Sequence, residues 1–349
     1  MFKKKTSSTY IKFPSELRFN LVSKDWVIIA TGRGKRPTLF KKKRKEKTEI
    51  LKKECPFCNL TPASKPTLIF PFNLDLNSQK SFKKWTTIVI PNKYPAFLPF
   101  QKLEKRMENN LYQTINAIGF CEIVITKDHQ KTLAFLSIEK AKEVFDAYQQ
   151  RYLILMKEKF VNYISIFHNH GKAAGATQSH PHSQIITTPL IDIDLSRALL
   201  NSKNYFKKHK RCIYCEMNEW EKKAQKRIVF ENKDFLVICP FASKTAFEII
   251  ISPKEHLSNF ETITEEKKWQ LAEAFQNSLK RLHKALNEPA YNFYLHTAPC
   301  DRKDYSYYHW HWTILPKTDI WAGFEMGTRM EISTIAPEES AIYLRKQKI

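Results

Sequence analysis

The sequence predicts an α+β fold made of two tandem repeats, each a mainly antiparallel sheet with one long helix packed on it. Each half opens with a Cys-x-x-Cys pair, continues with a strand that ends in histidine, and closes with a helix and a His-x-His strand. The interval from His129 to His256 matches the interval from His180 to His309 to within two positions. Because two independent landmarks recur at nearly the same interval, a duplicated unit explains the pattern better than chance does.

The elements of the first repeat follow from its hydrophobic pattern. It begins at Cys55-Pro-Phe-Cys58, and the segment CEIVITKDH predicts a strand that ends at His129. The spacing of apolar residues near 3.6 predicts a helix over about 137–159, with Val144, Phe145, Tyr148, Tyr152 and Leu155 on its buried face. The segment YISIFHNHG predicts a further strand, which leads to His180-Pro181-His182.

The second repeat shows the same order. It begins at Cys212-Ile-Tyr-Cys215, and the segment FEIIISPKEH predicts a strand that ends at His256. A helix is expected over about 264–286, with Thr262 and Glu265 as a capping box. The strand YNFYLHT then leads to His309-Trp310-His311. We therefore predict an N-terminal half over 1–195 and a C-terminal half over 196–349, joined by the polar stretch LLNSKNYFKKHKR as a linker or exposed helix.

Composition excludes several classes of protein. Hydrophobic residues make up 42% of the chain, and no apolar run reaches the roughly 18–20 residues of a membrane helix. The basic N-terminus has no apolar core, so no secretory signal is expected. The odd count of 7 cysteines, four of them in the two pairs, favours metal or thiol chemistry in a reducing, cytoplasmic setting over a disulfide framework.

The chain is strongly basic. It has 58 Lys and Arg residues against 35 Asp and Glu residues, a formal net charge of +23. The lysines are spread in short runs over the whole chain, and no nucleic-acid-binding motif accompanies them. We therefore favour a solvated basic surface with a pocket for a small phosphorylated substrate, and keep a zinc-stabilised nucleic-acid-binding protein as the competing hypothesis.

The two repeats offer matching sets of metal ligands. A structural zinc site takes four nitrogen or sulfur ligands in a tetrahedron, and each repeat supplies two cysteines and two histidines in the same order. The sets are Cys55, Cys58, His129 and His180 in the first repeat and Cys212, Cys215, His256 and His309 in the second. The alternative is two redox pairs or free thiols with unrelated histidines. Cys121, Cys239 and Cys300 have no such partners in the pattern and are expected to be buried.

The His-Pro-His segment predicts a nucleophile. Residues two apart in a strand face the same side, so a metal-bound His180 places the His182 ring beside it and free for chemistry. Imidazole attacks phosphorus well and leaves a phosphoramidate readily. Gln184 on the same face is expected to bond a phosphate oxygen, and Arg33 and Arg36 to supply positive charge. Taken alone, the paired histidine is equally compatible with a metal-binding or core role.

These motifs resemble the galactose-1-phosphate uridylyltransferase family, a branch of the histidine-triad superfamily with two fused repeats that has ADP-glucose phosphorylase-like relatives. The resemblance covers nearly the whole chain, from LRFNLVSKDWVIIATGRGKRP through CPFC, PNKYPAF and NHGKAAGATQSHPHSQ to YHWHWTILP and AGFEMGTRMEIS. It implies that both halves are histidine-triad-like, that the chain binds two zinc ions, with iron as an alternative in the second site, and that the protein is a homodimer.

The resemblance also implies an activity in galactose and carbohydrate metabolism. UDP-glucose would give UMP to His182 and release glucose 1-phosphate, and galactose 1-phosphate would then take the UMP to form UDP-galactose. The alternative is adenylyl transfer from ADP-glucose to phosphate or a sugar phosphate. By resemblance, the nucleoside would meet Asn92 and Tyr94, the phosphates Asn169 and Thr177, and the hexose Phe324 and Glu325, with His296 and His311 near the second metal.

Three departures from the family pattern bear on the choice of substrate. Ser183 stands where the best-known uridylyltransferases carry glycine, and Lys93 replaces an acidic residue that contacts the ribose in some members. The second repeat has a cysteine pair, as in the ADP-glucose phosphorylases, where other members use glutamate. These features weaken the choice of uridine and galactose and leave the nucleotidyl-histidine chemistry unchanged. His168 and His170 are interpreted as surface residues or as residues near the metal.

Overall fold

The protein is described by a computed structural model that covers residues 15–33, 51–100 and 102–349. The predicted α+β class is confirmed, because a ten-stranded, antiparallel sheet dominates the molecule, in the order β10-β11-β12-β14-β13-β8-β9-β7-β4-β3. Its strands are β3 (Leu68–Ile69), β4 (Thr87–Pro91), β7 (Cys121–Thr126), β8 (Tyr163–His170), β9 (His182–Thr188), β10 (Ile228–Glu231), β11 (Phe235–Ile238), β12 (Ile249–Pro253), β13 (Tyr291–His296) and β14 (His311–Pro316).

The two repeats meet at the centre of this sheet. Strands β8 and β13 pair antiparallel, and Phe167 lies opposite Tyr294. The interval between these two residues equals the interval from His129 to His256, so they are counterparts in the two repeats, and an approximate twofold axis passes between them. The strand order on one side of the axis, β8-β9-β7-β4, mirrors β13-β14-β12-β11 on the other. The predicted pair of repeats thus forms one continuous sheet.

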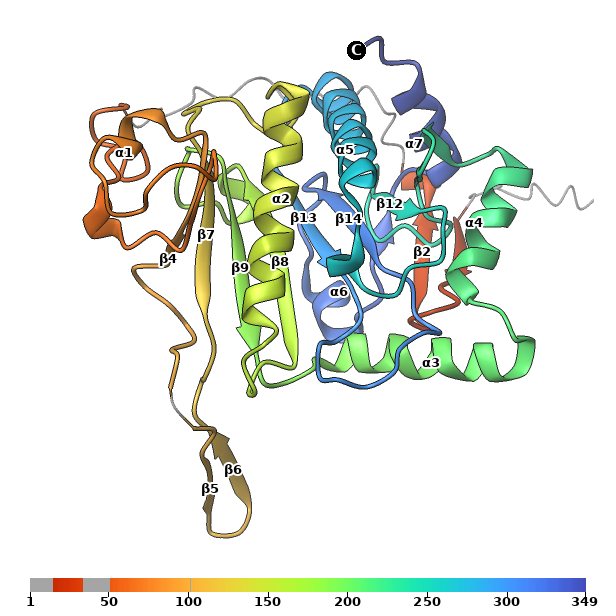
Figure 1. Ribbon diagram of the computed structural model, residues 1–349. Coiled ribbons are helices and arrows are strands. Elements are labelled where there is room, and N and C mark those ends of the chain that lie inside the picture. The colour runs from red at the N-terminus through yellow and green to blue at the C-terminus, as the bar shows by residue number, and fades with distance from the viewer. Residues whose placement is uncertain (1–14, 34–50, 101) are drawn as a thin grey trace, which may run out of the picture.

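One long helix from each repeat covers the same face of the sheet. Helices α2 (Ile138–Leu155) and α5 (Glu265–Leu286) lie side by side across the strands (Figure 1). Both were predicted, but α2 ends four residues earlier than expected. The capping box predicted for Thr262 is wrong: Thr264 caps α5 by accepting from the Lys267 backbone N–H, and the Thr262 hydroxyl donates to the Asn259 carbonyl.

The other elements surround this core. The helices are α1 (Ser81–Lys84), α3 (Ile193–His209), α4 (Ile213–Ala224), α6 (Gly323–Thr328) and α7 (Pro337–Arg345), and a hairpin of β5 (Lys105–Glu108) and β6 (Tyr112–Ile115) extends away from the body (Figure 1). The polar stretch before residue 211 forms α3, so the predicted boundary at residue 195 falls inside a helix. The division into two domains remains a prediction.

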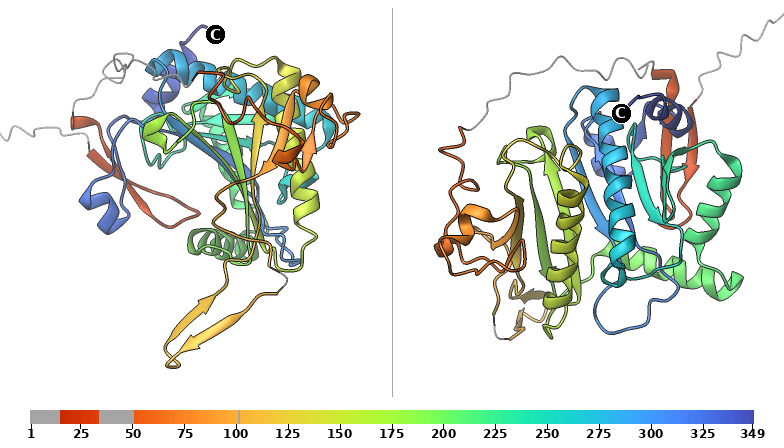
Figure 2. Two further views of the ribbon diagram at one scale, coloured as in Figure 1. Left: turned by 90° about the vertical axis from the view of Figure 1, so that its left-hand side faces the viewer. Right: turned by 45° about the horizontal axis from the view of Figure 1, so that its top comes forward.

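A small third sheet joins the two ends of the chain. Strands β1 (Ser15–Phe19) and β2 (Trp26–Ala30) form a hairpin, and β15 (Ile332–Ser333) pairs in parallel with β2. This sheet and α6 lie on the side of the main sheet opposite α2 and α5 (Figure 2). The N-terminal hairpin is therefore a structural part of the C-terminal half.

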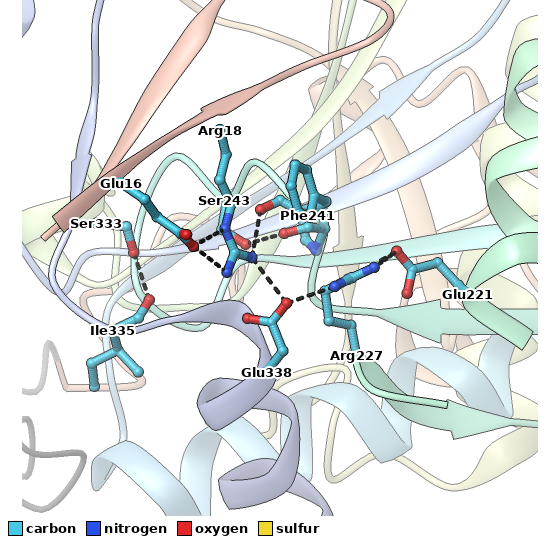
Figure 3. Close-up of polar contacts among 10 residues, drawn as sticks. Glu16, Arg18, Glu221, Arg227, Phe241, Ser243, Ser333, Ile335 and Glu338 are labelled. Atoms are coloured by element: carbon cyan, nitrogen blue, oxygen red, sulfur yellow. Dashed lines mark hydrogen bonds and ion pairs between the residues drawn. The ribbon is translucent and has the colours of Figure 1, made fainter. Parts of the chain in front are cut away.

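A chain of charges fixes the hairpin in place. Glu338 on α7 accepts from Arg18 of β1 at 2.9 Å and from Arg227 at 2.6 Å, and Arg227 also contacts Glu221 of α4 at 2.8 Å (Figure 3). Both guanidinium groups lie over the ring of Phe241, at 4.6 and 5.2 Å. These buried, charge-assisted contacts link three segments far apart in the sequence.

Within the described residues, no helix combines the length and the apolar character that crossing a membrane requires.

A buried ion pair fastens α2 to the sheet beneath it. Both partners are almost fully buried, and Arg151 of α2 makes two hydrogen bonds of 2.7 Å to the carboxylate of Glu122 on β7. The parallel, two-bond geometry is the most favourable one for a guanidinium and a carboxylate. Removing one partner leaves an uncompensated charge in the interior.

We expect Arg151→Ala to lower the free energy of unfolding by about 3–5 kcal/mol, because it leaves the buried Glu122 carboxylate without its charged partner. Urea denaturation followed by circular dichroism measures this change. The control is Arg106→Ala, which removes an exposed pair with Glu104 on the hairpin and should cost less than about 1 kcal/mol. Equal losses in the two variants would contradict this account of the Arg151 pair.

Candidate functional site

The first predicted ligand set comes together at one end of the main sheet. Cys55 and Cys58 lie in the loop before β3, His129 follows β7, and His180 precedes β9. Their ligand atoms all lie within 4.8 Å of one another. The Sγ atom of Cys58 is 3.2 Å from Nδ1 of His129, and Sγ of Cys55 is 3.4 Å from Nδ1 of His180. Two sulfur and two nitrogen donors around one point suit a tetrahedral metal site.

A backbone carbonyl orients the ring of His180, the buried histidine of this cluster. Its Nε2 donates to the Thr126 carbonyl at 2.7 Å, so Nδ1 carries the lone pair that points at the cysteines. A backbone carbonyl on the far nitrogen is the arrangement that fixes the tautomer of metal-binding histidines. Burial lowers the pKa of His180 to about 4, which keeps the ring in its neutral, ligand-competent form.

The second ligand set has the same geometry. The Sγ atom of Cys215 is 3.3 Å from Nδ1 of His256 and 3.4 Å from Nδ1 of His309, and the four ligand atoms again lie within 4.8 Å of one another. The far nitrogens donate to backbone carbonyls, His256 to that of Ser306 at 2.6 Å and His309 to that of Pro253 at 3.0 Å. The structure therefore brings together all eight predicted ligands in two clusters that suit a metal.

His182 lies next to the first cluster, and one of its ring nitrogens is hydrogen-bonded to the backbone. Nδ1 donates to the carbonyl of His180 at 2.9 Å, which leaves Nε2 unprotonated in the neutral ring. The ring is largely buried and contacts the edge of Phe57, with 5.0 Å between centroids. Burial lowers the pKa of His182, so the ring stays neutral near pH 7. A fixed, neutral imidazole with a free Nε2 is suited to nucleophilic attack.

Some of the residues that share its face have polar side chains. Gln184 stands two positions further along β9 and pairs with Phe167 on β8, so its side chain lies on the same face as the His182 ring. On β8, the Asn169 side chain accepts from Asn292 Nδ2 at 2.7 Å, and the same amide donates to the Ala174 carbonyl at 2.8 Å. Asn292 thus ties the loop that precedes His180 to the second repeat, a connection that the sequence did not reveal.

The loop between β8 and His180 uses glycine for its shape. Gly171 and Gly175 both adopt positive φ, 79° and 85°, a conformation that residues with a side chain rarely take. Thr177 lies in this loop with an exposed side chain. At these two positions the loop turns without a side chain.

Other predicted site residues lie at a distance from His182. Asn92 donates its backbone N–H to the carbonyl of Cys121, which pairs with Ile186, four residues along β9 from His182. Tyr94 is 81% exposed and follows in the same turn. Four strand residues span about 13 Å, so these two side chains are well separated from the His182 ring.

The remaining predicted residues lie elsewhere in the chain. Phe324 is exposed on α6, and Glu325 caps the same helix by accepting from the Ala322 N–H at 3.0 Å, so no contact between these residues and His182 appears in the described structure. Arg33 ends a short 3₁₀ helix of residues 31–33, and Arg36 lies outside the described residues.

A large cavity that sequence reasoning missed extends from the second repeat to β8 of the first, where Phe167 and Asn169 line it. It has a volume of about 1350 Å³ and is lined on one side by the strands of the main sheet and on another by the β1–β2 hairpin. His296 and His311 stack at its wall with 4.7 Å between ring centroids. Lys244 and Glu248 line it as well, and the only sequence signal for them is a charge at the start of an apolar run.

Glu248 gives this cavity a pH-dependent charge. Burial raises its pKa to about 7, against the opposing effects of the Lys244 ammonium and backbone N–H, while the nearby Glu331 carboxylate raises it further. The folded state therefore keeps a proton that the unfolded chain releases near pH 4.5. Stability should fall as the pH rises from about 4.5 to about 7 and lose nothing further from this group above that range.

We expect Glu248→Gln to leave stability unchanged at pH 4 and to raise it at pH 8 by about 3 kcal/mol, because glutamine avoids the buried charge and can still accept from the Lys244 backbone N–H. Thermal denaturation at both pH values measures the difference. Glu108→Gln, in an exposed strand of the hairpin, is the matched control and should change neither value. A loss of stability at pH 8 would refute the raised pKa of Glu248.

The chain is similar to known proteins over almost its whole length. Residues 4–191 match the model for the N-terminal domain of galactose-1-phosphate uridyl transferase, and residues 199–329 match the C-terminal domain. An ADP-glucose phosphorylase of Arabidopsis thaliana is 32% identical over 336 residues, covering 95% of this chain and 92% of the relative. A galactose-1-phosphate uridylyltransferase of Thermotoga maritima is 27% identical over 343 residues, covering 96% and 99%.

The fold is similar to solved structures as well. The crystal structure of an Arabidopsis thaliana ADP-glucose phosphorylase with bound ADP-glucose superimposes with a TM-score of 0.79 at 29% identity, covering 96% of this chain and 99% of that one. The resemblance stated from the motifs is thereby confirmed at the level of the whole chain. The chain belongs to the galactose-1-phosphate uridyl transferase family.

Proposed function

We propose that this protein is a nucleotidyltransferase that moves UMP between UDP-hexose and hexose 1-phosphate through a covalent intermediate on His182. The observation that carries the proposal is the ring of His182, whose Nδ1 donates to the His180 carbonyl at 2.9 Å and whose Nε2 is therefore a free base. The family match supports the reaction. The neighbouring cluster of cysteines and histidines, which could hold a metal ion, supports a rigid position for the His182 ring.

The proposed reaction has two balanced steps. In the first, Nε2 of His182 attacks the α-phosphorus of UDP-glucose, a phosphorus–nitrogen bond forms, and the bond to the bridging oxygen breaks to release glucose 1-phosphate. In the second, a phosphate oxygen of galactose 1-phosphate attacks the same phosphorus and displaces the neutral imidazole. The Gln184 amide would donate to a non-bridging oxygen and stabilise the charge that develops there.

The other predicted residues extend this site. Asn169 and Thr177 are proposed near the phosphates, and Asn92 and Tyr94 at the nucleoside. Arg33, Arg36, Phe324 and Glu325 complete the set of proposed substrate contacts. We also propose that the protein is a cytoplasmic homodimer, as the resemblance implies.

We propose zinc as the metal of both clusters. Two thiolates and two imidazoles are soft to intermediate donors, and four such donors gathered around one point suit zinc, with iron as the alternative in the second site. When bound, a zinc ion would cross-link its loop and strand ends as a structural element. The residues of this chain carry the transfer chemistry, since His182 is not a member of the cluster.

A second candidate function is adenylyl transfer from ADP-glucose to phosphate or a sugar phosphate. The identity of 32% to an ADP-glucose phosphorylase, with 95% of this chain covered, favours it. The cysteine pair of the second repeat also supports this branch, because Cys212 and Cys215 both lie in the second cluster. Both candidates use His182 in the same way and differ in the base and the acceptor. A zinc-stabilised nucleic-acid-binding protein, by contrast, would form no covalent nucleotide.

We expect His182→Ala to abolish release of glucose 1-phosphate from UDP-glucose, and of the corresponding product from ADP-glucose, by at least about a thousandfold, because no other group supplies the nucleophile. A coupled assay for the sugar 1-phosphate measures the loss. His209→Ala, on the outer helix α3, should retain full activity. Full activity of the His182 variant would rule out the covalent mechanism.

We expect the purified protein to hold two zinc ions per chain, and Cys58→Ser and Cys215→Ser each to lower the content to about one, because each variant removes one thiolate from a different cluster. Elemental analysis by mass spectrometry gives the count. Cys121→Ser changes a buried cysteine outside both clusters and should keep two ions. Unchanged metal in the first two variants would show that the clusters do not bind it.

A further inference from the structure

A chain of three buried polar side chains lies behind the nucleophile. The hydroxyl of Ser183, the residue after His182, is 2.6 Å from the Tyr148 hydroxyl on α2 and 3.1 Å from Nδ1 of His168 on β8. All three side chains are at least nine-tenths buried. Because Ser183 points to the opposite face of β9 from His182, the three groups lie under α2 and away from the substrate face. The interpretation of His168 as a surface residue or a residue near the metal is wrong: it lies beneath α2, stacked on Phe293.

The direction of these hydrogen bonds follows from the donors available. If Tyr148 donates to Ser183 and Ser183 donates to Nδ1 of His168, only the Nε2–H of His168 is left without a partner, as the structure shows for that atom. The reverse direction would leave both the Tyr148 proton and the His168 Nε2 lone pair unsatisfied. Burial raises the pKa of Tyr148 and lowers that of His168, so both groups are neutral and the chain persists near pH 7.

The second repeat shows what the fold itself requires at this place. Ser183 corresponds to Trp312, the residue after His311, and His168 corresponds by strand register to Leu295, which pairs with Trp312 as His168 pairs with Ser183. At the interval that relates Phe167 to Tyr294, Tyr148 corresponds to Phe275. The rings of Phe275 and Trp312 are in contact, with 5.3 Å between centroids.

Comparing the two repeats distinguishes the residues that packing requires from those that are retained for another reason. Both positions after a His-x-His are buried beneath the paired helices, so an apolar trio meets the packing requirement in the second repeat. The three polar groups occur in the first repeat, which also has Gln184. The counterpart of Gln184 in the second repeat is Thr313. A buried polar network is harder to satisfy than an apolar core, and it specifies one arrangement more strictly.

We propose that Tyr148 and His168 are positioning residues for the nucleophile, because by holding the Ser183 hydroxyl from two sides they fix the start of β9 and the aim of the His182 ring. Strand β9 begins at His182, directly after an irregular loop. Ser183 is therefore the first position inside the strand at which hydrogen bonds from neighbouring side chains can hold it in place. Its neighbours on α2 and β8 fix its position in two directions. The proposal rests on the function proposed for His182.

The expected consequence is a change in rate without a change in affinity. Small displacements of a reacting group cost one to two orders of magnitude in rate, while substrate contacts made elsewhere are retained. We expect Ser183→Ala and Tyr148→Phe each to lower the single-turnover rate of nucleotide transfer to His182 about tenfold at saturating UDP-glucose or ADP-glucose. The KM for the donor should stay within about twofold. The double variant should be no slower than about twice the worse single variant, because either change breaks the same chain.

The matched control is Tyr152→Phe. Tyr152 lies one turn further along α2, is equally buried, and its hydroxyl makes a 3.5 Å contact with the Ala298 carbonyl, away from β9. It should transfer nucleotide at the wild-type rate. Wild-type rates in Ser183→Ala, or equal losses in all three variants, would overturn the proposal. Metal content and thermal midpoint, measured in parallel, identify any loss of rate that comes from partial unfolding.

A second measurement does not depend on the donor. With histidine labelled by nitrogen-15, NMR reports the tautomer and the mobility of the His182 ring in the metal-loaded protein. A single Nδ1-protonated form is expected in the wild type and in Tyr152→Phe, and exchange between two forms in Ser183→Ala. One fixed form in all proteins would refute the positioning role. Failure of the wild type to accept any nucleotide, with the ring released in Ser183→Ala, would refute the proposed function and leave the positioning role standing.

Discussion

The rest of the site depends on the contacts that fix the orientation of the His180 ring. Its Nε2 is held by the Thr126 carbonyl at 2.7 Å and its Nδ1 points into the first cysteine cluster. Its own carbonyl in turn accepts from His182 and sets which nitrogen of that ring is free. Phe57 packs against both rings, with centroids 5.8 and 5.0 Å away. The end of β7, the first cysteine and histidine cluster and His182 are therefore mechanically linked.

The duplicated architecture allows the two halves to differ without loss of the fold. Both repeats have a cysteine and histidine cluster, a paired histidine and a helix over the same face of one continuous sheet. The first repeat adds Gln184, the glycine loop and the polar contacts of Ser183, whereas the second places Thr313 and Trp312 at the matching positions. We infer that the first half carries the transfer chemistry and the second half retains the scaffold. The β1–β2 hairpin, tied to α7 through Arg18, extends that scaffold.

Much of this arrangement could be predicted from the sequence, because strong local periodicity and repeated spacing leave few alternatives. The stripe that includes Tyr148 predicted α2, and the matched Cys-x-x-Cys and histidine landmarks predicted both clusters. Contacts between distant segments were beyond this reasoning. The pairing of Phe167 with Tyr294 joins strands from different halves of the chain, and the amide of Asn292 reaches across that junction. Local propensity contains no information about such contacts.

Some local predictions also failed for physical reasons. Thr262 has the right spacing to Glu265 for a cap, but a short 3₁₀ turn over Phe260–Thr262 directs its hydroxyl to Asn259, and Thr264 caps α5 in its place. The other face of the strand that holds His168 is half-buried, and His168 is buried by contacts with Phe293 and Ser183 from other segments. For Thr262 the competing contact is local, whereas for His168 it comes from other segments.

The central claim, a nucleotide carried on the free Nε2 of His182, is tested most directly by intact-protein and peptide mass spectrometry after brief exposure to UDP-glucose and, separately, to ADP-glucose. Our account predicts a mass gain of one UMP on the peptide that contains His182, removed by galactose 1-phosphate. A gain of one AMP at the same residue would keep the mechanism and assign the adenylyl branch. A nucleotide on another residue, or none from either donor, would contradict the account.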